Sequence, residues 1–290
     1  MQSTELGHTG TEISILGFGA MWLSIQGRPD RDQAIRTLNA ALDEGATLLD
    51  TADAYCLDEN DMGHNERLIA AVLRHRPDLH RIKVATKGGV IRPGGNWRTD
   101  ASPAHLREAC EASLRALGVE EIFLYQLHAP DASVPFDQSV ETLGELQREQ
   151  KIRHIGLSNV SLAQLQRARE LVDVQSVQNR FNPFDRDGQS EIIAECGSNG
   201  ITFLAYSPLG GKRLARGLSD FPLFQNLAEK YAVSPWAVAL AWDRAQGERV
   251  IPIPGSSTPE HTAVFSQAAK FALDPADVAA ITENGTERMG

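Results

Sequence analysis

The chain has 290 residues, of which 42% are hydrophobic and 23% charged, a composition typical of globular proteins with a full-sized core. Its 38 acidic and 28 basic side chains give a formal net charge of -10, which argues against a nucleic-acid or anionic-membrane partner. The sequence shows no signal-peptide pattern, no apolar run near the roughly 20 residues of a membrane span, and no C-x-x-C pair among its three cysteines. We therefore expect a cytoplasmic protein without disulfides or structural zinc.

The first elements predict a β-hairpin followed by a repeating α/β pattern. The pair Thr9-Gly10 lies between short alternating segments such as 13–15, as expected of a turn between two strands. Eight short apolar runs follow, each separated from the next by an amphipathic stretch. These runs, which we predict to be strands, are 16–21, 47–49, 82–86, 122–127, 154–157, 174–178, 201–206 and 250–253.

Helical patterns fill the intervals between these runs. The clearest begins at Ser102-Pro103 and ends at Gly118, where a serine N-cap, a proline at the first helical position and a C-terminal glycine all agree. The predicted helices are 32–42, 64–73, 103–117, 136–147, 162–171, 190–196 and 224–230, with further helices starting at 234–235, near 259–260 and at 274–275.

Eight strands that alternate with helices predict an α/β fold, a (β/α)8 TIM barrel with an N-terminal β-hairpin, as a single domain over residues 1–290. An open doubly wound sheet fits less well, because the first turn, 17–22, has Trp22 where a dinucleotide-binding loop needs its third glycine. The longest predicted loops are 88–100 and 208–221, after the third and seventh strands. Such loops on the C-terminal face of a barrel are where function is usually built.

Ionisable side chains follow three neighbouring predicted strands. Asp50 ends the second strand and Tyr55 follows it, Lys87 ends the third strand, and His128 ends the fourth. Singly, each has an ordinary structural explanation, such as a solvated lysine or a structural histidine. In a barrel, however, the carboxyl ends of the strands meet at one mouth, so we expect the four side chains to converge there.

This group of side chains suits proton transfer to a carbonyl oxygen. A free phenol has a pKa of about 10, and a neighbouring ammonium lowers that pKa. We expect Lys87 to supply this charge and Asp50 to keep Lys87 cationic. Tyr55 is then the general acid or base, and His128 hydrogen-bonds the carbonyl oxygen. The histidines show no metal-ligand spacing, so we expect no metal.

The motifs around these residues resemble those of the aldo-keto reductases. The matching segments are 50–52 with Tyr55, 63–66, 85–89, 127–128 and 156–159, and the resemblance runs from the hairpin to about Pro254. It implies that Asp50, Tyr55, Lys87 and His128 form a catalytic tetrad. It also implies a nicotinamide cofactor that lies extended across the barrel mouth.

The resemblance assigns further residues to that cofactor. Ser158, Asn159 and Gln178 are implied to bind the nicotinamide carboxamide, Tyr206 to stack on its ring, and the loop 207–212 to contact the pyrophosphate. For Lys212, a solvated loop side chain is an equal alternative. The complete implied set is Ser158, Asn159, Gln178, Tyr206, Ser207, Leu209, Gly211, Lys212, Gly255, Ser256, Ser257 and His261.

The segment after the last strand departs from the family pattern. Related enzymes place a Lys or Arg there to bind the 2′-phosphate of NADPH, whereas residues 255–265 contain neither. His261 stands where an Arg is common, and 264–265 replace a Glu-Asn pair. Hydroxyl and N–H groups of 256–258 can still donate to a phosphate. We therefore predict NADPH as the cofactor, with NADH as the alternative.

The substrate pocket is less readable from the sequence. Trp22 and Trp97 are candidates for its walls, although ordinary packing explains either equally well. Because the segment 285–290 is short, we expect an open pocket with broad specificity. The predicted function is NADPH-dependent reduction of a small aldehyde or ketone. Reduction of pyridoxal or of a sugar ketone is a narrower alternative. A regulatory subunit resembling potassium-channel β subunits is an alternative of another class.

Overall fold

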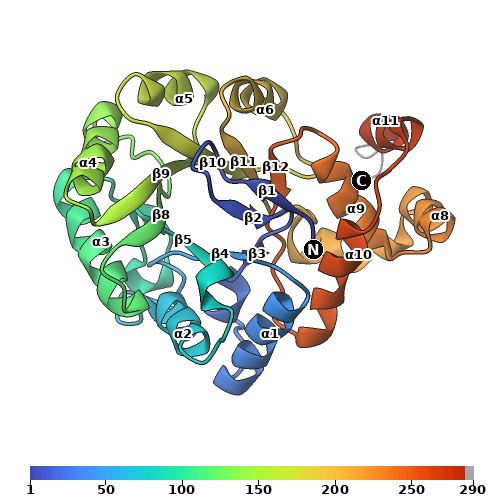
Figure 1. Ribbon diagram of the computed structural model, residues 1–290, viewed down its shortest axis with the longest axis horizontal. Helices are drawn as coiled ribbons and strands as arrows, with labels where there is room; N and C mark the ends of the chain where they lie inside the picture. The colour runs from blue at the N-terminus through green and yellow to red at the C-terminus, as the bar shows by residue number, and fades with distance from the viewer. Residues whose placement is uncertain (285–290) are drawn as a thin grey trace.

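The computed structural model describes residues 1–284. Eight strands form the centre of the molecule and helices surround them (Figure 1). The segment 285–290, on which the expectation of an open pocket depends, lies outside the described residues. The eight strands are β3 (Phe18–Gly19), β4 (Leu48–Asp50), β5 (Lys83–Gly88), β8 (Ile122–Leu127), β9 (Ile152–Ser158), β10 (Val174–Arg180), β11 (Thr202–Tyr206) and β12 (Val250–Pro252).

These strands form one parallel sheet in the order β12-β11-β10-β9-β8-β5-β4-β3. The two edge strands meet as well, because the N–H of Gly17 donates to Pro252 O at 3.0 Å and the N–H of Gly19 donates to Pro254 O at 3.0 Å. The predicted (β/α)8 barrel is therefore confirmed. All eight predicted strands are present, with ends shifted by a few residues.

The helices follow the strands as the sequence predicts. Ser102 Oγ accepts from the N–H of His105, and Gly118 ends that helix with a left-handed φ of 70°, which a residue without a Cβ adopts easily. The helices are α1 (Arg31–Asp43), α2 (His64–Leu73), α3 (Pro103–Leu117), α4 (Phe136–Arg148), α5 (Leu162–Arg169), α6 (Gln189–Ser198), α7 (Gly211–Gly217), α8 (Pro222–Tyr231), α9 (Pro235–Arg244), α10 (Ala263–Ala269) and α11 (Pro275–Asn284).

The predicted long loops contain regular structure that the sequence did not reveal. In 88–100, β6 (Val90–Ile91) pairs antiparallel with β7 (Arg98–Thr99). In 208–221, α7 precedes a short 3-10 helix. Elements of two to seven residues are too short to carry a detectable hydrophobic period, so their positions depend on contacts made in the folded chain.

An N-terminal hairpin covers the end of the barrel at which the strands begin. Its strands are β1 (Ser3–Glu5) and β2 (Glu12–Ser14), and it lies over the strands in Figure 1. The N–H of Gly7 donates to Thr202 Oγ1 at 2.7 Å, at the first residue of β11. Leu6 and Ile13 pack inside the barrel on the inward side chains of β4, β5, β8 and β11. The hairpin therefore leaves the opposite face as the mouth.

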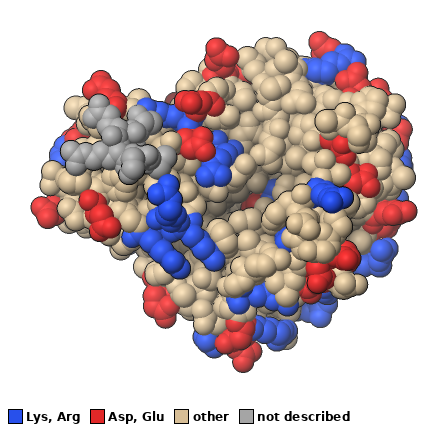
Figure 2. Space-filling view, turned by 180° about the vertical axis from the view of Figure 1, so that it is seen from behind, with Lys and Arg blue, Asp and Glu red and all other residues tan. Residues whose placement is uncertain are grey.

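Figure 2 shows that opposite face, which is hollowed near its centre and has Lys and Arg side chains on its rim. Within 1–284, no helix is both long and apolar enough to cross a membrane. The same residues include no group of three or more His, Cys, Asp or Glu side chains placed to hold a metal ion.

Candidate active site

Lys87 is the centre of a fully buried polar cluster at the mouth end of β4 and β5. Its side chain has no exposed surface, and Nζ donates to Asp50 Oδ2 at 2.7 Å, to the Thr51 carbonyl at 2.9 Å and to Tyr55 Oη at 2.9 Å. The pairing of Asp50 with Ala85 across the two strands fixes this arrangement. All three ammonium protons are used, so Lys87 holds Tyr55 in one orientation.

The charges of this cluster support one another. Burial opposes the positive charge of Lys87, but the Asp50 carboxylate and the hydrogen bonds to Asp50 and Tyr55 outweigh it, and the pKa of Lys87 is raised. Lys87 is therefore a cation, as predicted. Asp50 also accepts from Gln178 Nε2 at 2.7 Å and from Gln126 Nε2 at 3.3 Å on its other oxygen, which stabilises the carboxylate.

Tyr55 differs from the prediction in its protonation. Burial raises its pKa to about 12, although the charge of Lys87 acts to lower it. The prediction of a lowered pKa is wrong for this structure, because the loss of water around the phenol costs the phenolate more than the ammonium returns. Tyr55 is therefore a protonated hydrogen-bond donor across the neutral pH range.

His128 lies beside Tyr55 on the loop that follows β8. The two ring centroids are 5.7 Å apart and nearly perpendicular, at 83°. Burial, with a contribution from the Lys87 charge, holds the pKa of His128 well below its usual value. The imidazole is therefore neutral, and one of its nitrogens carries a proton that it can donate to an oxygen atom in the mouth. The four predicted catalytic side chains are thus brought together.

Three of the predicted cofactor residues join this cluster through Asn159. Its Nδ2 donates to the His128 carbonyl at 2.9 Å and to Ser158 Oγ at 3.1 Å, while its Oδ1 accepts from Tyr206 Oη at 2.8 Å. Asn159 has a left-handed φ of 58°, a conformation that is uncommon outside glycine and that concentrates at functional sites. The ends of β8, β9 and β11 are thereby held in a fixed relation.

The loop after β11 approaches the loops after β3 and β12. Ser207 has a left-handed φ of 51°, and its carbonyl accepts from Asn182 Nδ2 at 3.0 Å. Lys212 is exposed, and its Nζ lies 4.0 Å from the centroid of the Trp22 ring. A Cβ on Gly255 would lie 3.2 Å from Trp22 Cδ1. Trp22 therefore lies between the predicted pyrophosphate loop and the end of β12.

Leu209 and Gly211 of this loop are only partly exposed, so the predicted cofactor face is not fully open there. Gly211 has a left-handed φ of 83° at the first residue of α7, and a Cβ there would meet nothing within 4 Å. Side-chain space is therefore available at Gly211, and backbone conformation explains the glycine.

The segment after β12 is organised by hydroxyl groups. Ser256 Oγ donates to the Thr258 carbonyl at 2.8 Å and accepts from the Thr258 N–H at 3.0 Å. The Ser257 carbonyl accepts from Gln33 Nε2 of α1 at 2.8 Å, and His261 is exposed on a short 3-10 helix. Phe265 is buried, with its ring centroid 6.0 Å from that of Phe18, so the side chain at this position packs in the core.

The two predicted substrate-wall tryptophans occupy different places. The Trp97 ring lies 6.4 Å from the Tyr55 ring at 77°, and 47% of its surface is exposed. Trp22 packs against Lys212 and Gly255 instead. Trp97 therefore stands at the Tyr55 side of the mouth, and Trp22 stands at the side of the predicted cofactor loops.

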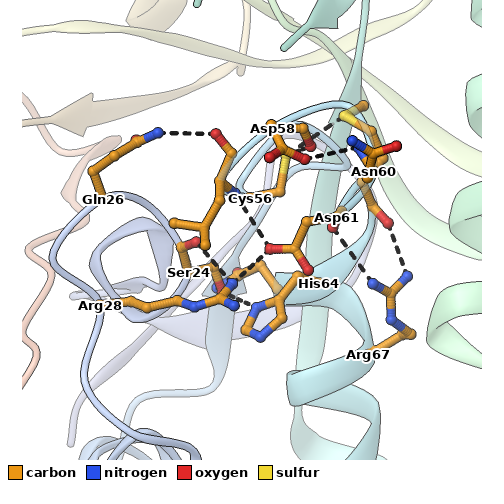
Figure 3. A network of polar contacts seen from close by, with 12 residues as sticks. Ser24, Gln26, Arg28, Cys56, Asp58, Asn60, Asp61, His64 and Arg67 are labelled. Atoms are coloured by element: carbon orange, nitrogen blue, oxygen red, sulfur yellow. Dashed lines mark hydrogen bonds and ion pairs between the residues drawn. The ribbon is translucent and has the colours of Figure 1, made fainter. Parts of the chain in front are cut away.

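The loop that follows Tyr55 is fastened by a polar network (Figure 3). Arg28 Nη1 donates to Asp61 Oδ2 at 2.6 Å, Gln26 Nε2 donates to the Leu57 carbonyl at 2.9 Å, and His64 Nδ1 lies 2.8 Å from Ser24 Oγ. These bonds connect the loop after β3 to the loop 56–63. The segment that follows Tyr55 is consequently held in place by the loop after β3.

Several contributors to the site were missed from the sequence. Gln126 lies inside β8, and a lone buried amide within an apolar run was the available signal. Thr51 contributes a backbone carbonyl to Lys87, and its hydroxyl donates to Asn65 Oδ1 at 2.6 Å. Arg92, which contacts Trp97, gave no signal in the sequence because its partners are backbone carbonyls and an amide side chain.

Comparisons with known proteins agree with this arrangement. A sequence model of the Aldo/keto reductase family matches residues 15–285. The protein named Probable aldo-keto reductase 1, from Glycine max, is 34% identical over 286 residues, which cover 89% of this chain and 81% of that protein.

Solved structures share the fold over almost the whole chain. The glycerol dehydrogenase of Gluconobacter oxydans has 30% identity and a TM-score of 0.83, and the match covers 97% of this chain and 94% of that one. An aldo/keto reductase from Klebsiella pneumoniae, solved with NADP and acetate, has 24% identity and a TM-score of 0.81 with the same coverage. Because the family model and these relatives match along nearly its full length, the chain belongs to the aldo/keto reductase family.

Proposed function

We propose that this protein reduces an aldehyde or ketone to the alcohol with NADPH as the hydride donor and Tyr55 as the proton donor. The observation that carries the proposal is the contact of Lys87 Nζ with both Tyr55 Oη, at 2.9 Å, and Asp50, at 2.7 Å. An ammonium fixed against a protonated phenol stabilises the negative charge that develops when the phenol gives up its proton.

Each member of the cluster has a distinct task in this mechanism. Tyr55 protonates the carbonyl oxygen as that oxygen gains charge. Lys87 stabilises the phenolate that remains, and Asp50 keeps Lys87 charged within a buried site. His128, which is neutral, donates a hydrogen bond that orients the same oxygen. Acetate accompanies NADP in the Klebsiella pneumoniae structure, so that relative accommodates a small oxygen-bearing molecule together with its cofactor.

The residues around the mouth fit an extended, anionic dinucleotide. The hydroxyl of Thr258 is buried and has no hydrogen-bond partner within 1–284, so it is free to donate to a phosphate. In the same part of the chain, no carboxylate pairs with Lys212, whose ammonium rests only on Trp22. A Cβ on Gly255 would come within 2.4 Å of the Gly19 carbonyl, so the two loops can meet closely only at a glycine.

These features suit the pyrophosphate and the ribose phosphate of NADPH. The side-chain amides of Asn159, which bonds Ser158, and of Gln178 would then lie near the nicotinamide end of the cofactor. When bound, NADPH supplies the hydride that reduces the carbonyl carbon. Gln178 donates to Asp50 in this structure, and its oxygen remains available to the carboxamide.

Replacing Tyr55 with Phe tests the proposal. We expect NADPH oxidation with 4-nitrobenzaldehyde to fall by about 10²–10⁴-fold, the usual contribution of a general acid, while the Kd of NADPH stays unchanged. Tyr231→Phe is the matched control, because that phenol lies on α8 and bonds Asp274 and Asp277, away from the mouth. Retained turnover in Tyr55→Phe would exclude Tyr55 as the proton donor. A wild-type protein that binds NADPH but reduces no carbonyl would favour the regulatory alternative.

A further inference from the structure

Arg92 is a buried cation that has no role in the reaction proposed above. Its side chain is 1% exposed, and no carboxylate pairs with it in the part of the chain that the structure describes. A charge removed from water without a counter-ion is costly unless its hydrogen-bond donors are well satisfied. The surroundings of Arg92 must therefore supply that satisfaction.

The guanidinium of Arg92 satisfies its donors on three separate loops. Nη2 donates to Gly95 O at 2.7 Å, to Gln26 Oε1 at 3.0 Å and to Leu57 O at 3.2 Å. Nε also donates to Gly95 O, at 3.2 Å, and Nη1 to Ala54 O at 3.4 Å. Arg92 thus joins the turn between β6 and β7 to the segment that carries Tyr55 and to the loop after β3.

The turn between β6 and β7 is held tightly against those two loops. Gly95 has a φ of 78°, and a Cβ there would lie 3.0 Å from Leu57 O and 3.2 Å from Gln26 Nε2. The N–H of Gly94 also donates to Glu59 Oε2 at 2.6 Å. Gln26 is bonded to the Leu57 carbonyl in the network of Figure 3, so Arg92 extends that network to a third loop.

The same guanidinium supports Trp97. The Arg92 Cζ lies 3.8 Å from the centroid of the Trp97 ring, a stacking distance, and Trp97 lies with its ring 6.4 Å from that of Tyr55. An indole that is 47% exposed would otherwise adopt several rotamers. Arg92 holds it in one orientation beside the proposed proton donor.

We propose that Arg92 is a positioning residue that fixes Trp97 as a wall of the carbonyl pocket and thereby favours carbonyl substrates with an aromatic group over small aliphatic ones. The inference rests on the proposed reductase function. Arg92 itself touches neither substrate nor cofactor, since its donors are occupied by the three loops. Trp97 supplies the flat apolar surface on which an aryl group packs.

The first test follows Trp97 without any turnover. The chain has four tryptophans, so protein labelled with 5-fluorotryptophan gives a fluorine NMR spectrum in which Trp97→Phe identifies one resonance. We expect this resonance to shift or broaden in Arg92→Met and to stay unchanged in Arg98→Met. Arg98 is the matched control because it is exposed on the same hairpin. An unchanged Trp97 resonance in Arg92→Met would overturn the inference.

The second test is the split between KM values. In Arg92→Met we expect KM for 4-nitrobenzaldehyde to rise about five- to tenfold, the order of one aromatic contact, with KM for propanal and the Kd of NADPH unchanged. In a Trp97→Ala background, Arg92→Met should add no further rise, because both changes remove the same wall. Independent, multiplied effects in the double variant would contradict the proposal.

Arg92→Lys provides a second test if Arg92→Met does not fold. Arg92→Lys retains the charge but cannot reach carbonyls on opposite sides with a planar fork, so we expect the same changes in the Trp97 resonance and in KM. Wild-type behaviour of Arg92→Lys would overturn the inference. Failure of the wild type to reduce either carbonyl would refute the proposed function instead, and the NMR comparison would still decide the role of Arg92.

Discussion

The Tyr55 side of the barrel mouth and the segment after β12 differ in how far the fold fixes them. On the Tyr55 side, Lys87 has no exposed surface, and its ammonium group donates three hydrogen bonds to defined acceptors. After β12, His261 is exposed, and Ser256 bonds its own neighbour, Thr258. The proposed catalytic group is therefore held by buried strand ends, whereas the residues proposed for the adenosine end, such as His261, lie on a partly exposed segment whose last residue, Phe265, packs in the core.

The largest expected effect comes from removing the central charge. Lys87→Met leaves Asp50 buried without its cation, which costs about 3–5 kcal/mol in the free energy of unfolding. It also removes the group that stabilises the phenolate, so we expect kcat to fall by about 10²–10⁴-fold. Urea denaturation and steady-state kinetics measure the two effects.

Lys212→Met is the surface control, and it should leave stability within about 0.5 kcal/mol of the wild type because its lysine is exposed. If Lys87→Met proved as stable as Lys212→Met, Lys87 and Asp50 would not form the buried ion pair on which the comparison depends.

A smaller effect is expected at the segment after β12. His261→Arg places a permanent cation where residues 255–265 have neither Lys nor Arg. We expect the Kd of NADPH to fall by about tenfold, the value of one charge-assisted hydrogen bond to a phosphate, while the Kd of NADH stays the same. Titration of cofactor fluorescence measures both constants, and His261→Gln is the neutral control. Equal tightening of NADPH and NADH would place the 2′-phosphate elsewhere.

The smallest expected change concerns pH. Because burial raises the pKa of Tyr55 to about 12, the phenol stays protonated throughout the neutral range, and kcat/KM for reduction should be flat from about pH 6 to pH 9. The folded pKa lies above the value of about 10 for the unfolded chain, so Tyr55 costs stability only as the pH rises from about 10 toward 12. A decline in kcat/KM with an apparent pKa near 7 that disappears in Tyr55→Phe would contradict this assignment.

The sequence predicted the convergence of the four ionisable side chains better than the structure of the loops around them, for a physical reason. Asp50, Lys87 and His128 each end an apolar run, and strand ends in a barrel converge whatever the details of packing. The direction of the pKa shift of Tyr55 could not be predicted in the same way, because it depends on how completely the phenol is buried. The neighbouring charge of Lys87, taken alone, predicted a lowered pKa, whereas the pKa is raised.

The structure of the loops could not be predicted from the sequence, because it depends on tertiary contacts between distant segments. The hairpin of β6 and β7 has two residues in each strand, and apart from Gly95 the hydrogen-bond partners of Arg92 lie 35 to 66 positions away. No periodicity marks such contacts. The buried position of Phe265 is a further case, since its contact with Phe18 in the core also leaves no periodic signal in the sequence.

The most direct test of the proposed function is to follow the hydride. NADPH that carries deuterium at the transferable position is incubated with the protein and 4-nitrobenzaldehyde, and the product is analysed by mass spectrometry. We expect 4-nitrobenzyl alcohol with one deuterium on the carbinol carbon, formed by the wild type and lost in Tyr55→Phe. Alcohol without deuterium, or equal labelled product from Tyr55→Phe, would contradict it.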